Sequence, residues 1–275
     1  MTTSAASTER VRFPAAPTFP VAAGSVPPSV IRAGSYSLRF AATPADLDLI
    51  LRLRFEVFNL ELHEGLDTAF ATGRDEDEFD SLFHHLLVWH HPSGSCVGTY
   101  RMQTSGMAQK HRGYYSSGEF DLGGMSADLL QQSVEIGRAC VAREHRTGRV
   151  LHLLWRGLAE YLTWNRCHSL FGCCSLTSQE LALGGRAYRH LQALGTEHPT
   201  AKAAPLAGLE CQLPEVRAGE AVEPVHIPAL FQSYLNLGAR ILGPPAIDRL
   251  FKTIDFLVLL DVRELDLRAY QSFFR

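Results

Sequence analysis

Three arginines surround one glycine in a short turn, and together they could bind a phosphate group. Arg143, Arg146 and Arg149 flank Gly148 immediately before an apolar segment of helical periodicity, Val150–Trp164. The N-terminus of a helix offers unpaired backbone N–H groups, and neighbouring arginines strengthen the attraction for an anion. The spacing therefore predicts an anion-binding turn.

Acidic and basic residues gather in two separate stretches of the chain. Residues 61–80 carry eight acidic residues against Arg74, whereas residues 138–156 carry five arginines against Glu144. Such segregation indicates two ligands, or two parts of one ligand, of opposite charge, although two solvated faces would give the same pattern. The net charge of −3 argues against a nucleic-acid partner.

Metal and disulfide chemistry have little support in the spacing of cysteine and histidine. The six cysteines include no CxxC pair, and Cys173 and Cys174 lie within an apolar run. The doublets His84–His85 and His90–His91 would point to opposite faces of an extended segment, so neither doublet could share one metal. We therefore expect no metal site.

The elements that position these residues alternate between strand and helix patterns. Apolar or alternating runs predict the strands, and apolar residues at helical spacing predict the helices, without an internal repeat. This order predicts a mixed α/β fold with a central sheet flanked by helices. The expected strands are 36–42, 84–90, 97–102, 134–141, 169–176 and 253–262, and the expected helices begin at 44, 150, 179 and 228, with a short one at the C-terminus.

Length and composition limit the class of protein. With 275 residues, 46% of them hydrophobic, the chain can bury a sizeable core, which excludes a fully disordered protein. No apolar run reaches the roughly 18 residues that a membrane span needs, and the N-terminus lacks the apolar core of a secretory signal. We expect a cytoplasmic protein that is peripheral to the membrane at most. Residues 1–35, rich in Ala, Ser, Thr and Pro, predict a disordered tail, and 36–275 predict one domain.

The basic turn resembles that of a known enzyme family. Arg143-x-x-Arg146-x-Gly148 is similar to the Q/R-x-x-G-x-G/A turn of Gcn5-related N-acyltransferases, with Arg146 in place of the middle glycine. In that family the turn cradles the phosphates of coenzyme A or of an acyl-carrier phosphopantetheine. The resemblance implies the same fold here, and it assigns Arg143, Arg146, Gly148 and Arg149 to the donor.

Four further motifs occur in the order found in acyl-homoserine-lactone synthases, which share that fold. They are Arg54-x-x-x-Phe58, the acidic run DEDEFD ending in Asp80, Gly98-Thr-Tyr-Arg101, and Glu135-x-x-Arg138. Lactone synthases usually carry a tryptophan between the first helix and the acidic run, and residues 59–74 contain none. This departure weighs against lactone synthesis.

The segments EIGRACV, REHRTGRVLHLLWRGL and PALFQSYLNLGARILGPPAIDRLFKTIDFLVLL look like those of bacterial ornithine N-acyltransferases. This resemblance covers roughly residues 36–273. It implies transfer of a 3-hydroxyacyl chain from acyl-carrier protein to the α-amino group of ornithine, giving lyso-ornithine lipid, with no permanently bound cofactor. It also implies acyl-carrier protein as partner and contact with the inner membrane through the lipid product. The alternatives are another amino-acid acceptor, an acyl-homoserine-lactone synthase, or a non-catalytic module that binds an acyl carrier or acyl-CoA.

The chemistry of amide formation suggests roles for individual residues. An amine that attacks a thioester must lose a proton, and a positioned base contributes roughly 10²- to 10⁴-fold. Glu135 is the candidate base, and backbone N–H groups near Gly137–Cys140 could stabilise the oxyanion. Residues three apart on a regular strand face opposite sides, so joint function of Glu135 and Arg138 requires a β-bulge.

The remaining candidates concern the amino-acid substrate. Arg101 and Arg138 could hold its carboxylate, because a guanidinium group matches a carboxylate with two hydrogen bonds. Arg54 lies among apolar residues and is expected to be partly buried and paired with an acid, with a structural or a substrate role. Asp77 and Asp80, which match acidic positions of the lactone synthases, could attract the terminal ammonium of ornithine, although a solvated acidic loop is the alternative.

Overall fold

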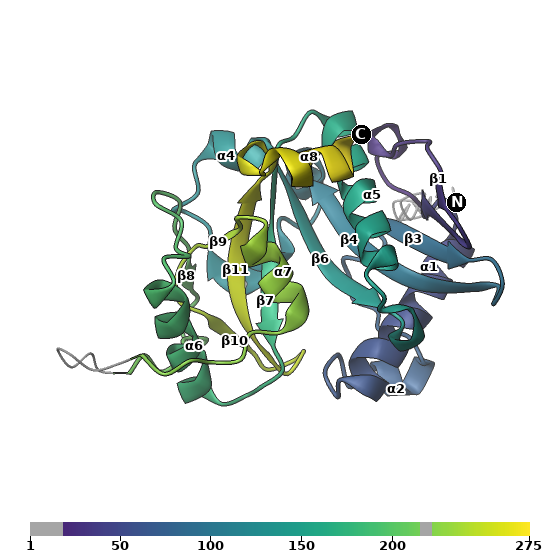
Figure 1. The fold of residues 1–275 in the computed structure, drawn as a ribbon. Coiled ribbons are helices and arrows are strands. Elements are labelled where there is room, and N and C mark those ends of the chain that lie inside the picture. The colour runs from purple at the N-terminus through teal and green to yellow at the C-terminus, as the bar shows by residue number, and fades with distance from the viewer. Residues whose placement is uncertain (1–18, 215–221) are drawn as a thin grey trace, which may run out of the picture.

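A nine-stranded mixed sheet forms the centre of the protein, and helices lie on both of its faces (Figure 1). The structure, a computed structural model, describes residues 19–214 and 222–275. Its strand order is β1-β2-β3-β4-β6-β7-β11-β10, with β9 pairing with β11. The strands are β1 (Ile31–Ala33), β2 (Tyr36–Phe40), β3 (His84–His90), β4 (Ser95–Thr104), β6 (Ser133–Val141), β7 (Ser169–Leu176), β9 (Arg240–Ile241), β10 (Ala246–Asp248) and β11 (Thr253–Asp261).

The helices vary in length, and the longest is α5. It spans 17 residues, and Gly148 precedes it in a left-handed conformation. The helices are α1 (Pro44–Arg54), α2 (Ala69–Thr72), α3 (Ser105–Lys110), α4 (Ala127–Gln131), α5 (Arg149–Asn165), α6 (Leu181–Ala193), α7 (Ala229–Asn236) and α8 (Leu267–Phe274), with the π-helix η2 (Phe55–Glu61) continuing α1. Short 3-10 turns are η1 (Ala23–Ser25), η3 (Tyr115–Gly118), η4 (Arg143–His145) and η5 (Val262–Glu264), and β5 (Phe120–Asp121) pairs with β8 (Ala204–Pro205).

Alternation along the strands separates two apolar layers. Leu86 of β3 packs in the large cluster that contains α5, whereas its neighbour Leu87 packs with Ile50 of α1. Successive side chains of a strand point to opposite faces, so α5 and α1 cover opposite faces of the sheet. On β7, Leu170 likewise belongs to the α5 face and Phe171 to the other face.

The parallel strands β6 and β7 separate part-way along their length. Their pairing covers Ser133↔Ser169, Val134↔Leu170 and Glu135↔Phe171, although both strands continue well beyond these residues. Figure 1 shows β6 and β7 running together at one end and diverging toward the other, with α7 in front of the gap. The fold therefore opens its sheet next to Glu135.

Most predicted elements are confirmed, but the predicted tail is too long. Residues 19–35 are folded: Ile31–Ala33 forms β1, and the Val21 carbonyl accepts a hydrogen bond from the buried His84. Residues 1–18 lie outside the described part of the chain. None of the helices in the described residues has the length and apolarity needed to cross a membrane.

Gly172 permits the close approach of β7 to β6 at the point where they separate. A Cβ atom there would lie 2.1 Å from the Ile136 carbonyl oxygen, so we expect Gly172→Ala to lower the free energy of unfolding by about 1 to 3 kcal/mol. A Cβ on Gly137 would meet nothing within 4 Å, so Gly137→Ala is the matched control, with a change below about 1 kcal/mol. Urea denaturation measures both, and equal stabilities of the two variants would contradict the close approach.

Candidate active site

A cavity of about 260 Å³ lies where β6 and β7 separate, and its walls differ in character. One part is apolar and belongs to the α5 face, whereas the other is charged and belongs to the α1 face. The apolar wall includes Tyr100, Leu170, Phe231, Tyr234, Val258 and Leu260, and the polar wall includes Glu64, Arg101, Tyr115, Arg138, Thr177 and Asp255. The cavity thus passes through the opening in the sheet and can hold an apolar chain at one end and a charged group at the other.

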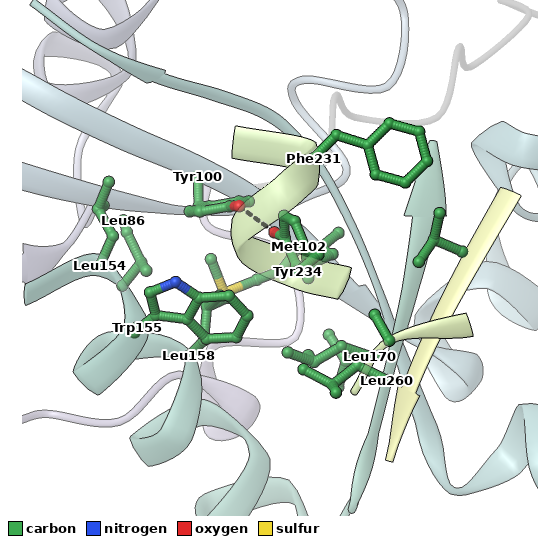
Figure 2. Packing of buried hydrophobic residues seen from close by; sticks show 14 of the residues in the cluster. Leu86, Tyr100, Met102, Leu154, Trp155, Leu158, Leu170, Phe231, Tyr234 and Leu260 are labelled. Atoms are coloured by element: carbon green, nitrogen blue, oxygen red, sulfur yellow. Dashed lines mark hydrogen bonds between the residues drawn. The ribbon is translucent and has the colours of Figure 1, made fainter. Parts of the chain in front are cut away.

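Helix α7 closes the apolar end. Figure 2 shows Tyr234 projecting from α7 toward Tyr100 of β4, and the two hydroxyl groups share a hydrogen bond. Trp155 of α5 packs against Tyr234 with ring centroids 5.0 Å apart. These contacts connect α7 to both β4 and α5, so the apolar wall is built by the fold itself.

A β-bulge on β6 turns Arg138 toward the charged end. Arg101 pairs with Gly137 and Thr99 with Cys140, so β6 has one residue more than β4 in this interval. Arg138 has φ 49°, a left-handed conformation like that of the first residue of a G1 bulge. The predicted bulge is confirmed, and it places the Arg138 guanidinium on the α1 face, which Arg101 also occupies.

Three arginines and three aspartates form one buried ion network there. Arg54 binds Asp75 and Asp80, Arg101 binds Asp77 and Asp80, and Arg138 binds Asp77 and lies 3.5 Å from Asp75. The six opposite charges balance. Burial alone would raise the pKa of the Asp80 carboxyl, but the arginines hold it well below its usual range.

The predicted substrate residues are therefore distributed unequally around the cavity. Arg101 and Arg138 line it, and the Nε atoms of both lack a hydrogen-bond partner within the described chain. Arg54, Asp77 and Asp80 are not among the lining residues, and the side chains of Arg54 and Asp80 are 0% and 1% exposed. Substrate roles for these three residues remain predictions.

Aromatic rings hold the two cavity arginines in place. The Arg138 guanidinium lies 4.0 Å from the centroid of the Phe251 ring and 5.0 Å from that of Tyr115. Arg101 lies 4.8 Å from the same Tyr115 ring. Cation–π contacts of this kind restrict both guanidinium groups, and Arg138 Nη1 also donates a hydrogen bond to the Tyr115 hydroxyl.

Glu135 shares the α1 face with Arg138 but does not line the cavity. Its carboxylate accepts hydrogen bonds from the Ser116 backbone N–H and hydroxyl, from the Tyr115 backbone N–H and from Gln103 Nε2, at 2.6 to 3.0 Å. It is 1% exposed. The carboxylate thus holds the η3 turn that carries Tyr115, and its role as general base remains a prediction.

The basic turn lies on the surface at the N-terminus of α5. Arg143 and Arg149 are exposed, and α5 begins without a side-chain cap. Arg146 is exposed too, and it binds Glu61 through both terminal nitrogens. All three predicted arginines thus lie exposed at an uncapped helix end, and two of them are not paired with this acid.

His85, to which the sequence assigned no role, supports the acidic loop. Its Nε2 lies 2.8 Å from the Asp80 carbonyl oxygen and must donate, since a carbonyl only accepts. Burial lowers the pKa of His85 to about 4, so the ring is neutral at pH 7. It fixes the backbone at one member of the ion network.

Sequence reasoning missed three acidic residues near the cavity. Glu64 and Asp255 line it, and Glu119 lies beside Asp255. Asp255 had a signal, because it is the one charged residue within the apolar stretch TIDFLVLL. Glu64 and Glu119 lie in irregular segments whose placement depends on tertiary contacts.

Comparison with known proteins gives a consistent family. The acetyltransferase (GNAT) domain model matches residues 53–156. The chain is 31% identical to the L-ornithine N(alpha)-acyltransferase of Brucella abortus over 88% of this chain and 90% of the relative. It is 32% identical to the enzyme of the same name from Agrobacterium fabrum over 85% and 83%. A CoA-dependent acyl-homoserine lactone synthase, BjaI, covers 83% of this chain and 80% of its own with a TM-score of 0.47 and 14% identity.

The hydrogen bonds of Glu135 predict what its amide variant does. In Glu135→Gln an NH₂ group would face buried donors, so we expect stability to fall by about 1 to 3 kcal/mol. Thermal unfolding measures this loss, with Glu180→Gln, an exposed glutamate, as the control. A stable variant whose kcat falls at least about 10²-fold at unchanged KM would instead establish Glu135 as the base.

Proposed function

The chain belongs to the L-ornithine N(alpha)-acyltransferase family, and from this premise we propose that it transfers a 3-hydroxyacyl chain from acyl-carrier protein to the α-amino group of ornithine. The product is lyso-ornithine lipid. The observation that carries the proposal is the cavity through the opened sheet, apolar at the α7 end and charged at the other. An acyl chain is apolar and an amino acid is charged, so each substrate matches one end of the cavity.

The acyl chain fits the apolar end. Tyr100, Phe231 and Tyr234 line this end, and burying methylene groups against them is favourable by about 0.8 kcal/mol per group. The thioester then lies between this wall and Arg138. Backbone N–H groups of β6 near Gly137–Cys140, beyond the residues that pair with β7, would stabilise the oxyanion.

The α-carboxylate of the acceptor binds the cavity arginines. Arg138 and Arg101 each have an Nε without a hydrogen bond, and the hydrogen bonds that they donate to the surrounding aspartates come from their terminal nitrogens. A carboxylate bound there directs the α-amine toward the thioester carbon. The amine nitrogen forms the amide bond as the carbon–sulfur bond breaks, and the carrier thiol leaves with a proton.

Glu64 is a second candidate for the base, because it lines the cavity. Burial raises the pKa of its carboxyl, and the hydrogen bond from Thr177 offsets this only in part. A carboxyl with a raised pKa suits proton transfer from an ammonium better than one with an ordinary pKa. The Glu64 carboxylate would take the proton that the α-amine loses.

The donor approaches from the turn at α5. Arg143, Arg149 and the uncapped α5 N-terminus attract the phosphate of phosphopantetheine and the acidic surface of a carrier protein. The phosphopantetheine arm would extend from this turn along β6 into the cavity. Peripheral contact with the inner membrane, where the product belongs, stays part of the proposal.

Product analysis tests the function directly. The purified protein is incubated with 3-hydroxyacyl-carrier protein and an equimolar mixture of amino acids, and the products are identified by mass spectrometry. We expect 3-hydroxyacyl-ornithine as the main product. Acylation of another amino acid, formation of a lactone, or no product would each contradict the proposal.

Glu64→Gln should lower kcat by at least about 10²-fold with little change in the KM for ornithine, because a base acts in the transition state. The kcat of the wild type should fall as pH falls through the raised pKa of Glu64, and the variant should lack this dependence. Steady-state kinetics from pH 5 to 9 measure both. A kcat within about threefold of the wild type would exclude Glu64 as the base.

The double variant Arg143→Glu/Arg149→Glu should raise the KM for acyl-carrier protein about tenfold at low salt and leave the KM for ornithine unchanged. The defect should shrink in 0.5 M NaCl, because salt screens exposed charges over about 10 Å or less. Arg263→Glu/Arg268→Glu, a reversal of two exposed arginines near the C-terminus, is the matched control. An equal rise of the KM for acyl-carrier protein in the two double variants would show that the turn does not bind the donor.

A further inference from the structure

A second group of buried acids lies beside the cavity, separate from the ion network. It consists of Asp255 on β11, Glu119 after η3, and the neighbouring Cys173 on β7. One ligand atom from each of these residues lies within 4.8 Å of the other two. Asp255 is 4% exposed and Glu119 is 7% exposed, so neither carboxyl is a surface charge.

This group lacks the compensation that the ion network has. Neither Asp255 nor Glu119 forms an ion pair with an arginine, lysine or histidine in the described residues, whereas Asp75, Asp77 and Asp80 each do. Burial, followed by repulsion from Asp255 and Asp248, raises the pKa of Glu119 well above its usual range. Two acids held together without a cation are costly to the fold, and a cationic ligand would lower that cost.

Asp255 also has an unused acceptor at the cavity. Its Oδ1 atom is buried and lacks a hydrogen-bond partner within the described chain, and the residue lines the cavity together with Arg138. A buried acceptor without a donor costs about 1 to 3 kcal/mol. A donor from a bound molecule would satisfy it.

We propose that Asp255, supported by Glu119, binds the terminal ammonium of the acceptor and thereby selects diamino acids over amino acids with apolar side chains. The inference rests on the proposed function and adds the basis of its specificity. Arg101 and Arg138 hold the carboxylate at one side of the cavity, and Asp255 receives the second ammonium at the other. An acceptor with an apolar side chain would leave the Asp255 Oδ1 atom without a donor, and such an unpaired group gives strong discrimination.

The assignment differs from the sequence prediction that Asp77 and Asp80 attract this ammonium. Those two carboxylates already bind Arg54, Arg101 and Arg138. A divalent metal ion is the other cation that such a group could bind. Burial raises the pKa of the Cys173 thiol well above its usual range, and the EDTA and Zn²⁺ arm of the experiment below distinguishes a metal from the ammonium.

Asp255→Asn and norleucine together test the proposal. Norleucine carries a methyl group where ornithine carries its ammonium, so it leaves all other contacts unchanged. We expect Asp255→Asn to lower kcat/KM for ornithine at least about 30-fold. The kcat/KM for norleucine should stay within about threefold of the wild-type value, because the lost charge contacts only the terminal ammonium. Glu119→Gln should show a smaller shift of the same sign.

Stability separates this role from a structural one. An acid whose folded pKa is raised destabilises the fold once pH exceeds its unfolded pKa of about 4, and the effect is complete above the folded value. At pH 8 and without substrate, Asp255→Asn should therefore melt about 2 to 4 °C above the wild type. Saturating ornithine should raise the melting temperature of the wild type and not that of the variant.

The outcomes distinguish the two proposals. A wild type that does not acylate ornithine overturns the proposed function itself. If the wild type acylates ornithine, two results for Asp255→Asn overturn the ammonium site alone. One is an equal loss of kcat/KM for ornithine and for norleucine, and the other is a melting temperature below that of the wild type. Loss of activity in EDTA that Zn²⁺ restores would also overturn it, in favour of a metal site.

Matched variants complete the experiment. Asp46→Asn removes a buried carboxylate that pairs with Arg39 and caps α1, so it should lower stability without changing the ratio of ornithine to norleucine. Asp77→Asn breaks an ion pair with Arg101, and we expect it to lower activity on both acceptors alike. If Asp77→Asn changes the ratio of kcat/KM for ornithine to that for norleucine and Asp255→Asn does not, the terminal ammonium binds at the acidic loop.

Discussion

The buried ion network of three arginines and three aspartates joins the elements that carry the two cavity arginines to α1 and to the acidic loop. Arg54 ends α1, Arg101 lies on β4 and Arg138 lies on the bulge of β6, while the aspartates come from the loop 75–80. Removal of one member would leave an uncompensated buried charge, which costs about 3 to 5 kcal/mol. The network thus fixes the loop, the helix and the bulge relative to one another before any substrate binds.

The opening of the sheet depends on this arrangement. A parallel pair that stayed hydrogen-bonded along its full length would leave no space between β6 and β7. Pairing ends at Glu135↔Phe171, and the bulge immediately afterwards turns Arg138 to the α1 face, where the aspartates hold it. The Tyr100–Tyr234 hydrogen bond closes the opening on the other face. Charge thus shapes one end of the cavity and apolar packing the other.

Local sequence predicted the features that depend on local rules. The strands, α5 and its basic turn follow from periodicity, and the bulge follows from the requirement that Glu135 and Arg138 share a face. Whether a carboxylate is free or paired depends instead on contacts between distant segments. Nothing near Glu135 reveals that the η3 turn supplies three of its hydrogen bonds, and nothing near Glu119 reveals that it lies beside Asp255.

The two groups of acids show why net charge says little about a binding site. Asp75, Asp77 and Asp80 form the more conspicuous motif, yet three arginines neutralise them, so they offer no net field to a cation. Asp255 and Glu119 are separated by more than a hundred residues, and they remain uncompensated. A fold tolerates such destabilising groups when function needs them. The uncompensated acids, rather than the acidic run, are therefore the groups beside the cavity to which we assign the terminal ammonium.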